Sequence, residues 1–356
     1  MSESTPDWKT IDEMLAAAIG TLSTELWDGA MGGSGRETTL HRNAAAFDEI
    51  KLKPRVLTGV ASADLRTSFA GLDLAHPVMA APVGEIALFH PRGAAALAEA
   101  TARSGTAAFI GAVSSPSLEE VRAAGTGPLI FQLYMFGDLA WMKRLVARAE
   151  AAGYEAICLT VDTPVSGRLE RDLRNRLTLP PRPRPNFEGP YEPGSYSGGL
   201  LTWADVARLR EATRLPLILK GILSPEDAAL AVLHGIDVVC VSNHGGRQLE
   251  GAPASIEALP EIVREVAGKA EVIVDGGIRS GVDVVRALAL GARAVLVGKL
   301  MVLALAAGGC AGVVRMLDLL TDEVAVTMVN LGVAGVGDLG RQHLWLPAPQ
   351  QYGRHE

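Results

Sequence analysis

The segment SNHGGR (242–247) combines a titratable base with a fixed cation in a glycine-containing turn. His244 can take up a proton near neutral pH, and Arg247, three residues later, stays charged and can hold an anion. Together they are suited to removing a proton from a substrate that carries a negative charge nearby. A lone loop histidine is more often only hydrogen-bonded in place, so this interpretation requires other reactive groups beside it.

Lys220 is a second candidate, because it ends the otherwise apolar run LPLILK (215–220). A lysine in this place directs its ammonium group toward the polar end of a buried strand. There it can hold negative charge on a bound ring, or it can pair with an acid and be purely structural. The residues alone leave both interpretations open.

Two glycine-containing segments near the C-terminus each carry a cation. DGGIR (275–279) ends in Arg279, and Gly298 precedes Lys299. Glycine lets a phosphate approach the backbone closely, and the two side chains supply positive charge, so the segments predict a phosphate-binding site. The alternative is that the glycines end helices and the cations are solvated.

Eight short apolar runs position these residues, and they are typical of the buried strands of a parallel sheet. Amphipathic segments lie between most of them, and one has a helix start at Ser224-Pro225 and a stop at Gly235. Eight strand–helix units in about 220 residues predict an α/β protein with a (β/α)8 TIM barrel. The runs begin at Val78, Ala107, Pro128, Glu155, Pro216, Asp237, Glu271 and Arg293.

Polar residues or glycines follow each of these eight runs at the same end. Reacting groups in a (β/α)8 barrel gather at the carboxyl ends of the strands, so the repetition predicts an active site there. The residues concerned are Gly84, Gly111, Gln132, Tyr134, Thr160, Asp162, Lys220, His244, Arg247, Asp275, Gly277, Arg279, Gly298 and Lys299.

The expected organisation is a helical cap over residues 1–75, without repeated strands, followed by the barrel over residues 76–356. The fourth and fifth runs start 61 residues apart, and the excess contains PPRPRPNFEGPYEPG (180–194). A proline-rich insertion at a strand–helix connection predicts a lid over the active site, at about residues 177–201.

Composition narrows the possible partners. The chain of 356 residues has 33 Lys and Arg against 40 Asp and Glu, a net charge of −7 that disfavours nucleic acid or an anionic membrane as partner. Glycines and charges are expected to interrupt every apolar run before it reaches membrane-spanning length, and MSESTPDWKT lacks signal-peptide features. Three cysteines cannot all pair. We therefore expect a cytoplasmic enzyme, and no metal-binding motif is present.

In order and spacing, several segments resemble the FMN-dependent α-hydroxy acid oxidase and dehydrogenase family, which includes glycolate, lactate and hydroxymandelate oxidases and mandelate dehydrogenase. The resemblance covers nearly the whole chain and implies FMN as cofactor and a homo-oligomer, a tetramer in the family. The matching segments are TLHRNAAAFDEIKLKPRVL (39–57), FQLY (131–134), LTVDTP (159–164), LILKG (217–221), VSNHGGRQL (241–249), VDGGIRSG (274–281) and ALGARAVLVGK (289–299).

The resemblance also implies roles for individual residues. His244 would be the base, Asp162 would orient it, Tyr134 would bond the substrate oxygen, and Arg247 would grip the substrate carboxylate. Lys220 would stabilise negative charge on the reduced flavin ring. The implied FMN contacts are Pro82, Val83, Gly84, Gln132, Thr160, Lys220, Asp275, Gly277, Arg279, Gly298 and Lys299, the last standing where many relatives have Arg.

The chain departs from the family at the expected substrate pocket. Leu169 stands where the family has a second carboxylate-binding Arg, and Gly29 stands where it has Tyr or Phe. Val113 stands where glycolate oxidase has Trp. We therefore expect a bulky, aryl substrate such as mandelate, or one whose carboxylate is masked as an ester, amide or carrier-bound group.

The resulting hypothesis is oxidation of a 2-hydroxy acid to its 2-oxo product, with O2 reoxidising the flavin. One alternative is a dehydrogenase with another electron acceptor. Others are a non-redox FMN isomerase, which shares the barrel, and a non-catalytic flavin-binding scaffold. The intact pair of His244 and Arg247, together with Tyr134, argues against the isomerase, because these residues fit oxidation of a carbinol.

Overall fold

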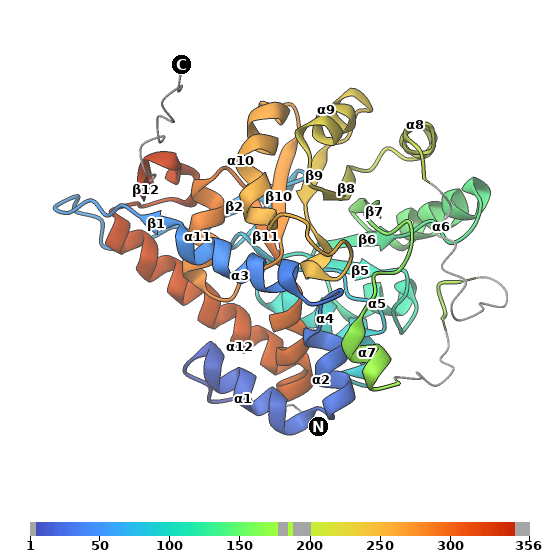
Figure 1. Cartoon of the computed structure of the whole chain (residues 1–356), viewed down its shortest axis with the longest axis horizontal. Coiled ribbons are helices and arrows are strands. Elements are labelled where there is room, and N and C mark those ends of the chain that lie inside the picture. Colours follow the sequence, from blue (N-terminus) through green and yellow to red (C-terminus); the bar gives the residue numbers. More distant parts are fainter. Residues whose placement is uncertain (1–4, 177–183, 188–200, 346–356) are drawn as a thin grey trace, which may run out of the picture.

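The computed structural model of the chain describes residues 5–176, 184–187 and 201–345 (Figure 1). Its centre is a closed barrel of eight parallel strands, each paired with the next in sequence and the last with the first. All eight predicted runs form these strands, so the predicted (β/α)8 barrel is confirmed. The strands are β4 (Val78–Ala80), β5 (Ala108–Gly111), β6 (Leu129–Leu133), β7 (Ala156–Thr160), β8 (Leu217–Ile222), β9 (Val238–Val241), β10 (Glu271–Asp275) and β11 (Ala294–Val297).

Helices surround the barrel and end where the sequence indicated. In α9 the Ser224 hydroxyl accepts a hydrogen bond from the Asp227 backbone N–H, and Gly235 follows with φ +68°. Gly153 ends α6 at φ +87°. The surrounding helices are α4 (Gly93–Arg103), α5 (Leu118–Ala124), α6 (Leu139–Ala152), α8 (Trp203–Ala212), α9 (Pro225–Leu233), α10 (Ser255–Val266), α11 (Gly281–Ala289) and α12 (Lys299–Leu331).

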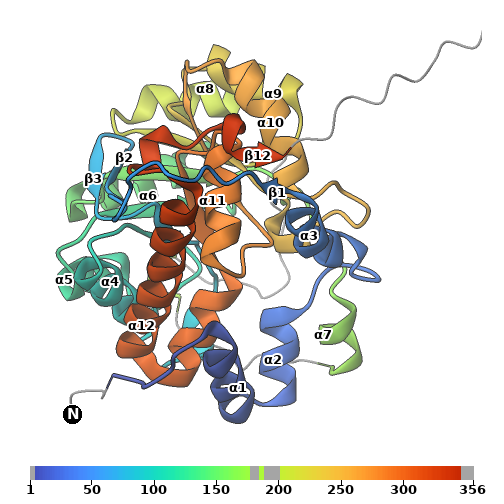
Figure 2. The same cartoon turned by 90° about the vertical axis from the view of Figure 1, so that its left-hand side faces the viewer.

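Segments before residue 78 close both ends of the barrel. At the carboxyl end, α2 (Thr24–Met31) lies beside the short helix α7 (Glu170–Arg174), as both views show (Figures 1 and 2). Helix α1 (Ile11–Thr21) packs against α12, and α3 (Thr38–Glu49) packs against the turn that contains His244. The helices of the cap therefore pack directly against the barrel, and they cover the end at which the predicted reactive residues lie.

The expectation that residues 1–75 form only helix and loop, without repeated strands, is wrong. A hairpin of β2 (Thr67–Phe69) and β3 (Leu72–Leu74) closes the amino end of the barrel, and β1 (Lys51–Leu52) pairs with β12 (Leu344–Trp345). Buried Phe69 packs on Phe109 of β5, with ring centroids 6.0 Å apart, and joins the apolar interior of the barrel. Strands of two or three residues give almost no alternating pattern, which is why the sequence did not reveal them.

Helix α12 contradicts the expectation about apolar run length. It contains an 18-residue window with mean hydropathy 2.0, long and apolar enough to cross a membrane by composition alone. However, 72% of that window is buried in the protein, and Gly308 and Gly309 kink the helix. Its apolar character therefore serves the contact with the barrel and with α1.

Most of the predicted lid lies outside the described residues, Arg182 included. The part that the structure describes, residues 184–187, lies against the connection between β5 and α5, where Asn186 donates hydrogen bonds to the carbonyl oxygens of Ala112 (3.1 Å) and Ser114 (3.3 Å).

Replacing Phe69 by Ala should lower the free energy of unfolding by about 3–5 kcal/mol, because it leaves a cavity in the barrel interior. Urea denaturation followed by far-UV circular dichroism measures the change. The control is Leu57→Ala, whose side chain is 101% exposed and whose loss should change stability by less than about 0.5 kcal/mol. Equal stability of the two variants would contradict this role of the hairpin.

Candidate active site

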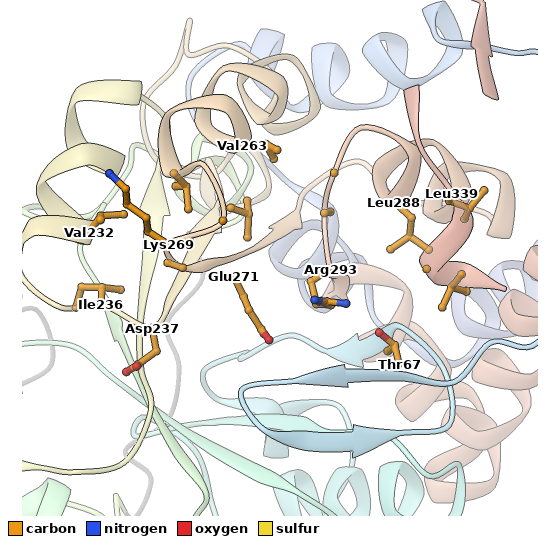
Figure 3. A pocket seen from close by; sticks show the side chains of 18 of the residues that line it. Thr67, Val232, Ile236, Asp237, Val263, Lys269, Glu271, Leu288, Arg293 and Leu339 are labelled. Carbon is orange, nitrogen blue, oxygen red and sulfur yellow. The ribbon is translucent and has the colours of Figure 1, made fainter. Parts of the chain in front are cut away.

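A cavity of about 1240 Å³ opens at the carboxyl ends of the strands. Another hollow, of about 720 Å³, lies at the opposite end, beside the β2–β3 hairpin and near Asp237, Glu271 and Arg293 (Figure 3). Barrel enzymes place their chemistry at the carboxyl end, so the larger cavity is the candidate active site. The predicted residues that line it are Gly29, Pro82, Val83, Gly84, Val113, Tyr134, Leu169, Lys220, His244, Arg247, Asp275, Gly277, Arg279, Gly298 and Lys299.

His244 is held between an acid and a phenol. Its Nδ1 lies 3.0 Å from Oδ1 of Asp162, and its Nε2 lies 3.5 Å from the hydroxyl of Tyr134. Burial would raise the pKa of Asp162, but its hydrogen bond with His244 and the charge of Lys220 outweigh burial and hold that pKa below its usual range. A carboxylate at Nδ1 favours the tautomer with its proton there, which leaves the Nε2 lone pair available to accept a proton.

The backbone around His244 is unusual, and residues that the sequence analysis did not single out support it. His244 has φ +59°, and its backbone N–H donates to the hydroxyl of Ser242. The side chains of Asn243 and Asn43 exchange two hydrogen bonds, of 2.7 and 2.9 Å, which tie this turn to α3. A Cβ on Gly221 would lie 2.5 Å from Cβ of Asp162, so glycine is required for that carboxylate to reach His244.

Lys220 has its acid in Asp275 on β10. Its Nζ lies 3.0 Å from Oδ2 of Asp275 and donates to Ser242 Oγ at 2.9 Å. Burial opposes the charge on Lys220, but Asp275 and Asp162 outweigh it and raise its pKa above the usual range. The ammonium group is therefore charged, and it also lines the cavity, so pairing with an acid and contact with a ligand are compatible here.

Gln132 and Thr160 stand at the ends of β6 and β7 but do not line the cavity. Both are buried, and Nε2 of Gln132 donates to Oγ1 of Thr160 at 2.8 Å. Their contact with a flavin ring stays a prediction.

The predicted phosphate site lies between the ends of β10 and β11. Gly277 has φ +88°, and a Cβ there would lie 2.3 Å from the carbonyl oxygen of Asn43. Arg279 is paired with Asp48 at 2.7 Å. Lys299 opens α12, and its Nζ donates to the carbonyl oxygens of Met31 (2.7 Å) and Gly32 (3.0 Å). Glycine backbone, a helix N-terminus and two cations together suit a phosphate.

Arg247 is anchored to the cap. Its Nη1 donates to the carbonyl oxygens of Gly29 (2.8 Å) and Gly32 (3.0 Å). Leu169, at the start of α7, lines the same cavity, and so does Arg171. Arg168 is largely exposed beside Glu170, and Arg171 is held by Glu37 and Asp28.

Comparison with known proteins agrees with this geometry. The family model described as FMN-dependent dehydrogenase matches residues 18–346. The chain belongs to this family. It is 44% identical to the L-lactate oxidase of Nostoc sp. (91% of this chain, 94% of that protein) and 42% identical to glycolate oxidase 1 of Zea mays (93% and 94%). A solved structure of an arginine-to-leucine variant of mandelate oxidase with 2-hydroxy-phenylacetamide superimposes with TM-score 0.88 at 44% identity, covering 95% of this chain and 98% of that one.

Membership makes the chain an FMN-dependent oxidoreductase that oxidises the CH–OH group of 2-hydroxy acids. The cavity fits FMN by three observations. It is larger than a typical small-molecule pocket of 300–1,000 Å³, so a flavin and a substrate can share it. Oδ1 of buried Asp275 has no hydrogen-bond partner among the described residues, as suits a ribityl hydroxyl. The glycines and cations predicted to bind the phosphate line the same cavity. Among the described residues no cluster suited to a metal ion occurs.

Lys299 should make FMN binding depend on pH. Burial, and then the charge of Arg247, lower its pKa from 10.5 to about 7, and a bound phosphate would raise it again. Above pH 7, FMN binding must therefore take up a proton, so its affinity should fall by up to about tenfold per pH unit as pH rises from about 7 to about 9. Quenching of flavin fluorescence during titration of the apoprotein measures this.

Two controls test whether the pH dependence of FMN binding comes from Lys299 and the phosphate. Lys299→Met should bind FMN more weakly but with a flatter pH dependence, and riboflavin, which has no phosphate, should show a flatter profile with the parent protein. A parent affinity for FMN that is constant between pH 7 and pH 9 would contradict the role of Lys299.

Proposed function

We propose that this family member oxidises a bulky, aryl 2-hydroxy acid, or a derivative with a masked carboxylate, to the 2-oxo product. The observation that carries the proposal is the wall of one cavity: Nε2 of His244 faces Tyr134, while Leu169 and Gly29 lie on the same cavity in place of a cation and an aromatic ring. His244 and Tyr134 suit oxidation of a carbinol, and the small or apolar residues Leu169 and Gly29 leave room beside it for a bulky substrate.

Each residue has a distinct part in the proposed reaction. His244 takes a proton from the carbinol group at Nε2, and Asp162 stabilises the imidazolium that forms. Tyr134 hydrogen-bonds the carbinol oxygen, and Arg247 binds the adjacent carbonyl or carboxylate oxygen. FMN, when bound, supplies the acceptor for the two electrons, and the charged Lys220 stabilises negative charge on its ring.

The size of the pocket supports an aryl side chain. Gly84 lies beside Val113 on the cavity wall. A Cβ added at Gly84 would lie 3.7 Å from Cβ of Val113, an ordinary van der Waals contact. Solved structures of similar chains are of mandelate oxidase: a tyrosine-to-phenylalanine variant with (S)-mandelic acid, and the arginine-to-leucine variant with 2-hydroxy-phenylacetamide. The tyrosine and the arginine changed in those variants lie 35 positions apart, the same separation as Tyr134 and Leu169 here. This match supports an amide or ester as substrate.

Oxygen is the proposed electron acceptor, because the lactate, glycolate and mandelate relatives are all named oxidases. Reoxidation of the reduced protein in air, followed by stopped-flow absorbance, tests this. Recovery of the oxidised flavin within seconds is expected, whereas reduced flavin that persists for minutes would indicate a dehydrogenase with another acceptor.

Replacing His244 by Ala should retain FMN but slow anaerobic flavin reduction by at least about 100-fold, the low end of general-base effects. Stopped-flow absorbance with mandelate or its amide gives the rate. His234→Ala is the matched control, because that histidine stacks on Trp203, outside the cavity, and its loss should leave the rate unchanged. Equal rates in the His244 variant and the parent would exclude His244 as the base.

Replacing Leu169 by Arg should strengthen binding of free hydroxy acids by about 1.5–3 kcal/mol, the range for hydrogen bonds to charged groups. Leu173→Arg places the same charge on α7 at a side chain that is 56% exposed, and it should leave affinity unchanged. Anaerobic titration with a free hydroxy acid gives the dissociation constants of the parent and of both variants, and their comparison tests the prediction. A parent that turns over lactate or glycolate as efficiently as mandelate would contradict the proposed pocket.

A further inference from the structure

A buried pair of amides joins the cap to the turn of the proposed base. Asn43 on α3 and Asn243 are only 1% and 4% exposed, and their side chains donate to each other. Nδ2 of Asn243 also donates to the carbonyl oxygen of Pro253 at 2.9 Å, and its Oδ1 also accepts from the backbone N–H of Gly246 at 3.0 Å. Both protons and both lone pairs of the Asn243 amide are therefore in use, and loss of Asn43 would leave one of each unpaired in the interior.

The turn that this pair supports has an unfavourable backbone. His244, Gly245 and Gly246 all have positive φ, of +59°, +63° and +77°. This conformation is uncommon for a histidine and persists only where the surrounding contacts hold it. Gly246 also packs closely on α3, because a Cβ added there would lie 2.6 Å from the backbone nitrogen of Leu40. Contacts with α3 thus hold the backbone from which His244 projects.

The start of α10 completes this set of hydrogen bonds. Ser255 is fully buried, its backbone N–H donates to Oδ1 of Asn43 at 3.3 Å, and its Oγ accepts from the backbone N–H of Asn243 at 3.1 Å. Three segments that are distant in sequence therefore share one buried network. Displacement of one segment breaks hydrogen bonds in the other two, so the three are expected to be ordered together.

The same helix contacts the predicted phosphate site. A Cβ added at Gly276 would lie 3.3 Å from Oδ1 of Asn243 and 3.4 Å from Nδ2 of Asn43, so the backbone of this loop lies directly on the amide pair. Nη2 of Arg279 donates to the carbonyl oxygen of Ala44 at 3.3 Å. Asn43 and Ala44 also line the cavity. Helix α3 therefore touches the phosphate loop and the turn of the base through the same residues.

We propose that Asn43 is a positioning residue that couples the phosphate site to the base. A phosphate held by Gly277 and Arg279 fixes their loop, and the loop fixes α3 through its packing on Asn43. The amide pair then suppresses local opening of the turn that carries His244. This inference rests on the proposed role of His244. Riboflavin brings the same ring without the phosphate, so it should leave the turn less ordered than FMN does.

Hydrogen exchange of the peptide that covers residues 242–249, followed by mass spectrometry, tests the coupling. The apoprotein is compared with the protein saturated with riboflavin and with the protein saturated with FMN. FMN should slow exchange in this peptide at least about fivefold more than riboflavin does, the low end of coupling between two sites. The comparison uses the parent protein and needs no turnover, so it is decisive even if a variant folds poorly.

Replacing Asn43 by Ala should remove the difference between FMN and riboflavin. With mandelate or its amide, the limiting rate of anaerobic flavin reduction should also fall by about 10- to 100-fold, because a slightly misplaced base reacts slowly. The dissociation constant of the substrate should change by less than about twofold, since the lost contact acts on the reaction and not on binding. A variant that is only less stable would bind less FMN but keep the rate per bound flavin.

The matched control is Thr39→Val. Thr39 is buried on the same helix, donates to the carbonyl oxygen of Leu249 at 3.3 Å and accepts from the backbone N–H of Gly251 at 2.9 Å, beyond the turn of the base. Its replacement removes buried hydrogen bonds of α3 without touching the amide pair. This variant should keep both the exchange difference and the rate of the parent.

Equal exchange with FMN and with riboflavin in the parent would overturn the inference. An undiminished exchange difference or an unchanged limiting rate in Asn43→Ala would overturn it as well. These results would leave the proposed function intact, because that function is tested by the rate of His244→Ala and by the ability of aryl 2-hydroxy acids or their amides to reduce the flavin.

Discussion

Charges buried at the mouth of the barrel must be paired, and the rest of the site depends on this constraint. Lys220 stays charged because Asp275 lies 3.0 Å away, and Asp162 stays ionised beside His244 and Lys220. Removing either acid would leave an uncompensated cation or a misdirected imidazole. The same pairing leaves one nitrogen of His244 and one oxygen of Asp275 available to ligands.

The pairing in turn requires backbone that only the assembled fold provides. Asp162, Lys220 and His244 lie in or just after the carboxyl-terminal parts of three adjacent strands, β7, β8 and β9, so closure of the barrel brings them together. Gly221 then permits the approach of Asp162, and α3 holds the turn of His244 through Asn43. The cap is therefore part of the active site, since its carbonyl oxygens also orient the cations that would face phosphate and substrate.

Strand positions could be predicted from the sequence, and most of the predicted site residues line the cavity. Parallel strands are continuous apolar runs, and their carboxyl ends share one edge. What escaped prediction depends on contacts between distant segments. Ser242 and Asn43 are ordinary polar residues until the fold places them at His244, and Glu85 is joined to Arg184 across 99 positions. The hairpin β2–β3 is too short for a pattern, and α12 is apolar because it is buried.

The most direct test of the pairing is the rate of anaerobic flavin reduction in an Asp162→Asn variant that retains FMN. The amide keeps the shape of the side chain, but it can neither stabilise an imidazolium nor fix the proton on Nδ1. Stopped-flow absorbance with an aryl 2-hydroxy acid or its amide should show a loss of at least about 100-fold relative to the parent. A variant that reduces its flavin as fast as the parent would contradict the account.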